Sequence, residues 1–115
     1  MKTLNKLSLV VAKEFSSTPG SRYKIEGDFS GELFRQSVLE PKLKQAIDEN
    51  ATLLIDLDGT AGYGTSFLEE AFGGLIREND YDYQTIKDHM KFKSEEEEYL
   101  IEDIYEYLKD AQNEK

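Results

Sequence analysis

The chain lacks cysteine, and this absence excludes disulfides, zinc sites built on thiolates and cysteine nucleophiles. It has one histidine, His89, so we expect neither a histidine-rich metal site nor a Ser-His-Asp triad. No apolar run is long enough to span a membrane, and the first residues lack the apolar core of a signal peptide. We therefore expect a cytoplasmic protein without a metal or another cofactor.

Positive charge is scarce: 14 Lys and Arg face 24 Asp and Glu, which leaves a net charge of −10. Nucleic acids and anionic membranes attract basic surfaces, so we expect neither as a partner. The acidic excess is compatible with a basic protein partner, or with an acidic inhibitor that occupies a nucleic-acid-binding groove by imitating its charge. Solubility alone also explains it. The length of 115 residues predicts a single domain, residues 1–115.

Apolar periodicity and turn residues predict elements in the order ββααβαβα. The expected strands are residues 7–15, 22–27, 53–57 and 85–93. The expected helices are a stretch that begins at Asp28 or Ser30 and ends at Asn50, one from Thr65 or Ser66 to Ile76, and a last one after Ser94. The first two strands suggest a β-hairpin, and the apolar run 53–57 predicts a strand buried on both faces. The fold class is a small α/β domain, a mixed sheet with helices packed against it.

Three positions bear on where the helices begin. Ser66 precedes Glu69, and Ser94 precedes Glu97, by the three residues of a capping box. Pro41 interrupts a helical pattern, so it either kinks the first helix or starts a second one.

The five residues Asp56-Leu57-Asp58-Gly59-Thr60 resemble the opening motif of haloacid-dehalogenase-type phosphatases. That resemblance implies a magnesium-dependent phosphatase in which Asp56 attacks phosphorus and Asp58 is a general acid/base. The chain after the motif does not supply the Ser or Thr, the lysine and the further acidic pair which that family needs. We therefore expect no catalytic residue here, and Asp56 and Asp58 are also common types beside a turn.

Two longer stretches resemble a different family. Residues 25–32 (IEGDFSGE) and 53–76 (LLIDLDGTAGYGTSFLEEAFGGLI) are similar to the bacterial STAS-like domains grouped as DUF4325. The most specific pieces are residues 66–70 (SFLEE) and 72–74 (FGG). The resemblance extends over about residues 5–110, and it implies a STAS-like fold without an established activity.

Within the wider STAS group, anti-sigma-factor antagonists carry a hydroxyl residue at the same strand-to-helix junction. A kinase phosphorylates it, and the added charge breaks binding to the partner. Aligned by eye, that segment falls on residues 64–68, with Ser66 at the regulated hydroxyl. Gly64 stands where the group has an acidic residue, and Phe67 where it has glycine. The implied partner is a histidine-kinase-type ATPase, an anti-sigma factor or another regulator.

The candidate site comprises Ser66, Thr65, Tyr63, Gly64 and Asp58. Ser66 has three interpretations: a helix cap, a phosphorylation switch, or a partner contact without modification. Tyr63, at the expected tip of the loop, is a candidate partner contact. We expect a non-catalytic regulatory domain that binds another protein.

Two glycines, Gly73 and Gly74, lie inside the predicted helix 66–76. Each costs roughly 1 kcal/mol relative to alanine in a helix, so something should compensate. Close packing against the sheet or a helix is one explanation, and a groove for a partner is another.

Overall fold

The computed structural model describes residues 6–115 and contains a sheet of three parallel strands. They are β1 (Lys6–Val10), β2 (Thr52–Asp56) and β3 (Met90–Lys93), in the order β1-β2-β3. In the register, Leu9 pairs with Ile55, and Ile55 pairs with Phe92. Because the strands are parallel, their carboxyl ends meet at one edge of the sheet.

Three long helices accompany the sheet, and two of them contain a π-helical turn. The first long helix consists of α2 (Gly31–Phe34), the π turn η2 (Arg35–Leu39) and α3 (Glu40–Asp48). The second consists of α4 (Thr65–Leu68), the π turn η3 (Glu69–Gly73) and α5 (Gly74–Arg77). The third is α7 (Tyr99–Asn113). The short helices are α1 (Val11–Glu14), the 3₁₀ turn η1 (Lys24–Glu26) and α6 (Tyr83–His89).

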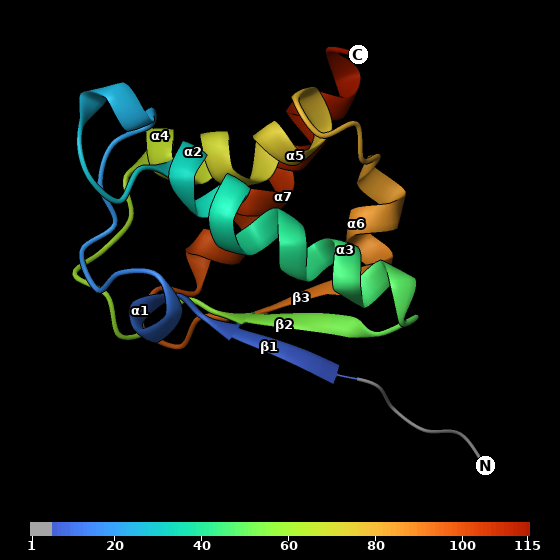
Figure 1. The fold of residues 1–115 in the computed structure, drawn as a ribbon, viewed down its shortest axis with the longest axis horizontal. Coiled ribbons are helices and arrows are strands. Elements are labelled where there is room, and N and C mark those ends of the chain that lie inside the picture. The colour runs from blue at the N-terminus through green and yellow to red at the C-terminus, as the bar shows by residue number, and fades with distance from the viewer. Residues whose placement is uncertain (1–5) are drawn as a thin grey trace.

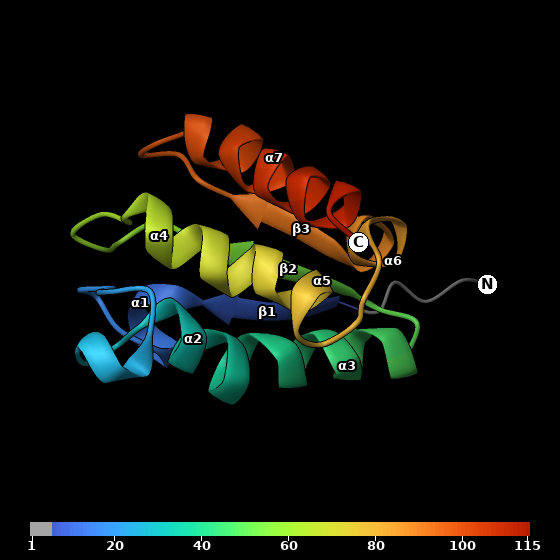
Figure 2. The same cartoon turned by 90° about the horizontal axis from the view of Figure 1, so that it is seen from above.

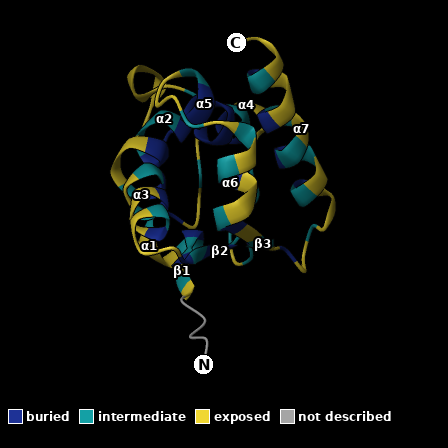
Figure 3. Cartoon of the chain, turned by 90° about the vertical axis from the view of Figure 1, so that its right-hand side faces the viewer, coloured by how far each residue is buried: buried dark blue, intermediate teal, exposed yellow. Residues whose placement is uncertain are grey.

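The three long helices lie side by side on one face of the sheet, as Figures 1 and 2 show. The helix α6 leads directly into β3 and stands at the amino ends of the strands (Figure 1). The buried sides of the helices face the interior and their exposed sides face outward (Figure 3). The result is a two-layer arrangement with one core between sheet and helices.

Alternate strand residues and aromatic helix residues fill this core. Strand residues that point toward the helices, among them Leu53, Ile55 and Met90, have no exposed surface. From the helices, Phe34 and Phe67 stack with ring centroids 5.7 Å apart. The fold class of a small α/β domain with helices packed against a sheet is therefore confirmed.

The opposite face of the sheet is open, which corrects the prediction that the middle strand is buried on both faces. Leu54 points away from the helices and is 36% exposed. Its neighbours on that face in β1 and β3, Ser8 and Lys91, are exposed too. None of the three long helices lies on that side (Figure 1). The prediction failed because leucine is equally apolar at a core position and at a half-exposed one.

The predicted hairpin is also wrong, and the sheet is consequently parallel instead of mixed. The first strand ends at Val10, where the chain turns into α1, and residues 22–27 contain η1 instead of a second strand. The backbone at the start of this segment bonds to the start of α2: Glu32 N–H donates to Arg22 O over 3.0 Å, and Gly31 N–H donates to Ser21 O, directly before the segment, over 2.8 Å. These bonds join the segment to a helix, so no strand forms.

The predicted strand 85–93 is half helix. Asp82 accepts a hydrogen bond from Thr85 N–H (2.7 Å) and caps α6, and only the last four residues form β3. The apolar residues Ile86 and Met90 are four residues apart, a spacing that places them on one face of a strand. That spacing suits a helix equally well.

Two other helix ends were predicted correctly, at Ser30 and at Asn50. Ser30 accepts a hydrogen bond from Leu33 N–H (3.0 Å) and caps α2, and Asn50 leaves α3 with a left-handed φ of 53°. Pro41 follows the π turn η2, and the helix passes through it without a break. The predicted cap at Ser94 is wrong: its hydroxyl donates to Glu97 O, and α7 starts only at Tyr99.

Candidate functional site

The junction between β2 and α4 lies at the carboxyl edge of the sheet, where parallel α/β folds commonly place their sites. Asp56 accepts a hydrogen bond from Asp58 N–H (3.0 Å), which forms a tight turn directly after β2. Gly59 (φ 89°) and Gly62 (φ 130°) then adopt angles that other residues resist. The chain returns at Gly64, which is the N-cap residue of α4.

Asp58 has a structural role at this edge. Its two carboxylate oxygens accept the backbone N–H groups of Glu96 and Glu95, each over 3.0 Å. These two bonds hold the pKa of Asp58 below its ordinary value. Asp58 therefore fastens the loop before α7 to the end of β2.

The phosphatase interpretation receives no support from the carboxylates at this edge. Asp56 accepts the turn bond, and Lys93 Nζ lies 3.7 Å from its other carboxylate oxygen. Within residues 6–115, no three His, Cys, Asp or Glu side chains are placed to hold a metal ion.

Tyr63 folds back onto the protein. Its hydroxyl donates to Leu57 O (2.9 Å), and its ring lies 5.9 Å from that of Phe67. Burial raises the pKa of the Tyr63 phenol well above its ordinary value. Tyr63 is thus a half-buried support for the loop and not an exposed tip.

Ser66 is exposed, and it does not cap the helix. The helix begins one residue earlier, at Thr65, and the expected partner Glu69 bonds to arginines instead. The capping interpretation of Ser66 is therefore wrong. Among residues 6–115, no side chain or backbone group bonds to the Ser66 hydroxyl, so the fold does not use it.

An apolar segment lies beside this junction. Ile25 is 94% exposed, and Tyr23 and Phe29 are exposed by nearly half. Phe29 has a left-handed φ of 56°, which is strained for a bulky residue. Its ring packs edge-on against Phe15, with the centroids 5.7 Å apart. We call residues 23–29 the apolar segment; it contributes three of the five large hydrophobic residues that the structure exposes among its described residues.

An ion network joins the apolar segment to the helix that carries Ser66. Arg22, directly before that segment, approaches Glu69 over 2.5 Å and Glu70 over 3.4 Å. Arg77 also pairs with both glutamates. Burial raises the pKa of Glu69, but the bonds from Arg77 and Arg22 outweigh it and hold the value below normal.

The network continues into the protein through a buried pair. Arg35 (3% exposed) lies in η2, and its Nη1 is 3.3 Å from the carboxylate of Glu70 (4% exposed) in η3. The two π turns thus face each other across an ion pair. Single π turns inside α-helices often occur at functional sites.

The helical glycines make room for this network. A Cβ on Gly74 would come within 2.6 Å of Arg35 Nη1, and one on Gly73 within 2.7 Å of Glu69 Oε2. Close packing therefore compensates for the two glycines, as one of the two explanations predicted. The packing partners are charged side chains of the network.

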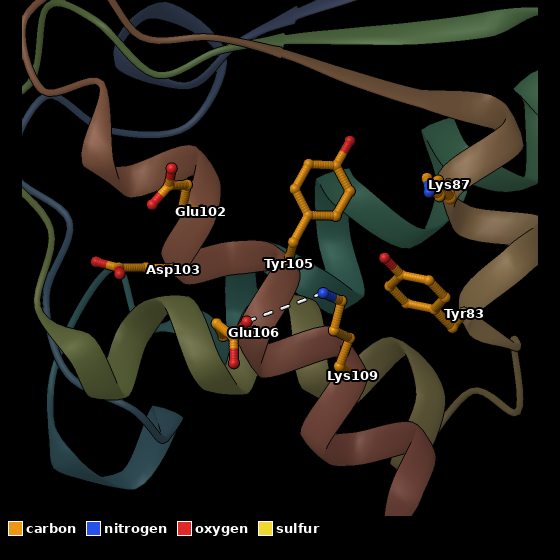
Figure 4. Close-up of a pocket in the computed structure, with 7 residues that line it drawn as sticks. All are labelled: Tyr83, Lys87, Glu102, Asp103, Tyr105, Glu106 and Lys109. Carbon is orange, nitrogen blue, oxygen red and sulfur yellow. Dashed lines mark ion pairs between the residues drawn. The ribbon is translucent and has the colours of Figure 1, made fainter.

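Two surface hollows lie outside the predicted site. One, about 560 Å³, is formed by α6 and α7 (Figure 4). Its cations already have neighbours: Lys109 pairs with Glu106 (3.9 Å), and Lys87 lies over the ring of Tyr83. The other, about 680 Å³, lies between β3 and the start of α7. Neither hollow contains any of the predicted site residues.

The sequence predicts that residues 63–66 lie at the strand-to-helix junction, and in the structure they do. Asp58 lies at the same edge but bonds to the loop before α7. Sequence reasoning missed Ile25, which it placed in a strand, and the arginines of the network. The double glycine after Glu69 and Glu70 was a usable signal, because it required something bulky to lie beside the helix.

The fold defines a small α/β domain of the STAS-like class. More particularly, a protein-family model described as a STAS-like domain of unknown function (DUF4325) matches residues 30–100, and the chain belongs to that family. The matched range is shorter than the predicted 5–110 and leaves out the apolar segment. Searches of curated proteins and of solved structures found no match.

STAS-like domains are generally non-catalytic. In the part of the chain that the structure describes, no helix is both long and apolar enough to cross a membrane.

Proposed function

We propose that this protein is a non-catalytic regulatory domain that binds another protein through the β2–α4 junction and the apolar segment. The observation that carries the proposal is the exposed hydroxyl of Ser66, which the fold does not use, beside an exposed apolar surface. Large exposed apolar side chains gathered in one segment are typical of interaction surfaces. By resemblance, the partner is a kinase-type ATPase, an anti-sigma factor or another regulator.

Phosphorylation of Ser66 would control this binding. A protein kinase transfers the γ-phosphoryl group of ATP to Ser66 Oγ: the new O–P bond forms, the bond to the β-phosphate oxygen breaks, and ADP leaves. The hydroxyl proton passes to a base of the kinase. The product adds nearly two negative charges beside the apolar segment, which disfavours an apolar partner surface there.

The experiment is affinity capture of the partner from an extract of the organism that makes the protein. The baits are wild type, Ser66→Glu and Ile25→Ser. We expect wild type to capture a protein that both variants lose. Because Ile25 is almost fully exposed, its replacement should leave the fold unchanged.

Two controls make the comparison specific. Ser66→Ala should still capture the partner, and its free energy of unfolding should stay within about 0.5 kcal/mol of wild type, since Ser66 is not a cap. Ser37→Glu places the same charge on an exposed helical serine elsewhere. Equal capture by wild type, Ser66→Glu and Ile25→Ser would overturn the proposal and assign the binding to another surface.

A further inference from the structure

The outer edge of β3 is free to pair with another strand. β3 is the last strand of the sheet, and β2 lies on one side of it only (Figure 2). Lys93 O accepts a hydrogen bond from Leu57 N–H over 2.8 Å, so the backbone groups of Lys93 point toward β2. Because backbone groups alternate along a strand, the N–H and C=O of Phe92 point to the outer edge. Among residues 6–115, neither of them has a hydrogen-bond partner. An unpaired strand edge is a template for a further strand.

The hollow of about 680 Å³ between β3 and the start of α7 borders this edge. Its apolar surface comes from Phe92, Tyr99 and Ile101. Tyr99 is 58% exposed, and the other two are partly exposed. A chain that pairs with β3 would direct alternate side chains toward α7, and an apolar one among them would cover these three residues. The strand edge and the hollow therefore form one surface.

The rim of the hollow is acidic. Glu95, Glu98 and Glu102 line it, and all three are exposed. No Lys or Arg within residues 6–115 forms an ion pair with any of them. Lys93 also lines the hollow, but its Nζ lies 3.7 Å from the carboxylate of Asp56, which does not. Unpaired carboxylates at a rim attract a basic partner and repel an acidic one.

We propose that β3 and this hollow bind an extended basic segment of a partner protein as a fourth strand of the sheet. The backbone of the segment pairs with Phe92, and one apolar side chain covers the floor of the hollow. Lys or Arg side chains on both sides of it pair with Glu98 and Glu102. A second copy of this chain suits the acidic rim poorly, because each copy has a net charge of −10.

This surface shares no residue with the one under the proposed function. The β2–α4 junction and the apolar segment lie outside the lining of the hollow. The inference also does not depend on phosphorylation of Ser66. Either proposal can therefore fail while the other stands.

The experiment measures hydrogen exchange at Phe92 N–H by NMR on the full chain, without and with a peptide probe. The probe is the acetylated and amidated peptide Thr-Lys-Thr-Val-Thr-Lys-Thr, which in a strand presents lysine, valine and lysine on one face. At a free concentration of about ten times its Kd, the probe should slow this exchange about tenfold, because the N–H then donates to the probe.

Two control peptides separate the backbone from the charges. The first carries a methyl group on each backbone nitrogen, so it keeps both lysines but cannot donate to a strand. The second has glutamate in place of both lysines. Neither should slow exchange at Phe92. If the methylated peptide slows it as much as the probe does, charge alone explains the binding and the fourth strand is wrong.

A pair of variants tests the acidic rim. Glu102→Gln should weaken binding of the probe about threefold, since one exposed ion pair is lost. The matched control is Glu78→Gln, which removes the same charge from an exposed residue after α5 and should leave the Kd unchanged.

Three results would overturn the inference. The first is exchange at Phe92 that the probe does not slow. The second is a Kd that Glu102→Gln leaves unchanged, or that Glu78→Gln raises equally. The third is exchange at Phe92 that slows as the protein concentration rises without the probe, which would assign the edge to a second copy of the chain.

Discussion

At the scale of single residues, Ser30 and Ser66 show how similar sequence settings lead to different roles. Both stand at the start of a long helix. Ser30 bonds to Leu33 N–H and is committed to the fold, whereas Gly64 takes the cap position in front of Ser66. Ser66 is thereby free to take part in something other than folding.

Asp58 makes stability depend on pH. The backbone N–H groups of Glu96 and Glu95 lower the pKa of Asp58 in the folded state. The carboxylate therefore stabilises the fold fully above its unfolded pKa of about 3.9. This stabilisation is lost as the pH falls through the folded-state pKa. We expect Asp58→Asn to be less stable than wild type at pH 7, and the gap to shrink at pH 3. Urea unfolding at the two pH values measures it, and a gap that does not change with pH would contradict the role of Asp58.

At the scale of elements, the first and second long helices approach each other closely at Gly31. A Cβ at this position would lie under 3.0 Å from the backbone oxygen of Phe67. Because backbone yields less than a flexible side chain, we expect Gly31→Ala to destabilise the protein by about 1–3 kcal/mol. Urea unfolding checks the value.

The control for Gly31→Ala is Gly64→Ala, which has open space around its Cβ and an ordinary negative φ. Alanine is a poorer cap than glycine by about 0.5–1 kcal/mol, but it also lowers the entropy of the unfolded chain by a similar amount, so the net change should stay within about 0.5 kcal/mol. Equal losses for the two variants would show that the close approach does not matter.

The elements that could be predicted from sequence are those with local causes. The strand after Thr52 follows from its apolar run, and the start of α2 follows from the hydroxyl of Ser30. The segment 22–27 could not be predicted, because Arg22 O bonds to Glu32 N–H of α2, a contact that the residues of the segment do not indicate. The ion pair between Arg22 and Glu69 could not be predicted from the sequence either, because the residues next to each of them do not indicate which residue it pairs with.

At the scale of the whole molecule, helices cover only one face of the sheet. Substitutions at Ile55 and Leu54, which point to opposite faces of β2, test this arrangement. Ile55→Thr places a hydroxyl in the core and should cost about 2–4 kcal/mol. Leu54→Thr lies on the open face and should cost less than about 1 kcal/mol. Threonine favours strands, so strand propensity does not confound the pair. Similar losses in urea unfolding would mean that the second face is also covered.

The parallel sheet also affects the order in which the protein can fold. Residue 6 pairs with residue 52, and residue 53 pairs with residue 90, so each strand pairing closes a long loop that contains a long helix. Such distant contacts form slowly compared with the turns of a helix. During synthesis, β1 has no strand to pair with until residues 52–56 have been added, and its backbone stays unpaired for that interval.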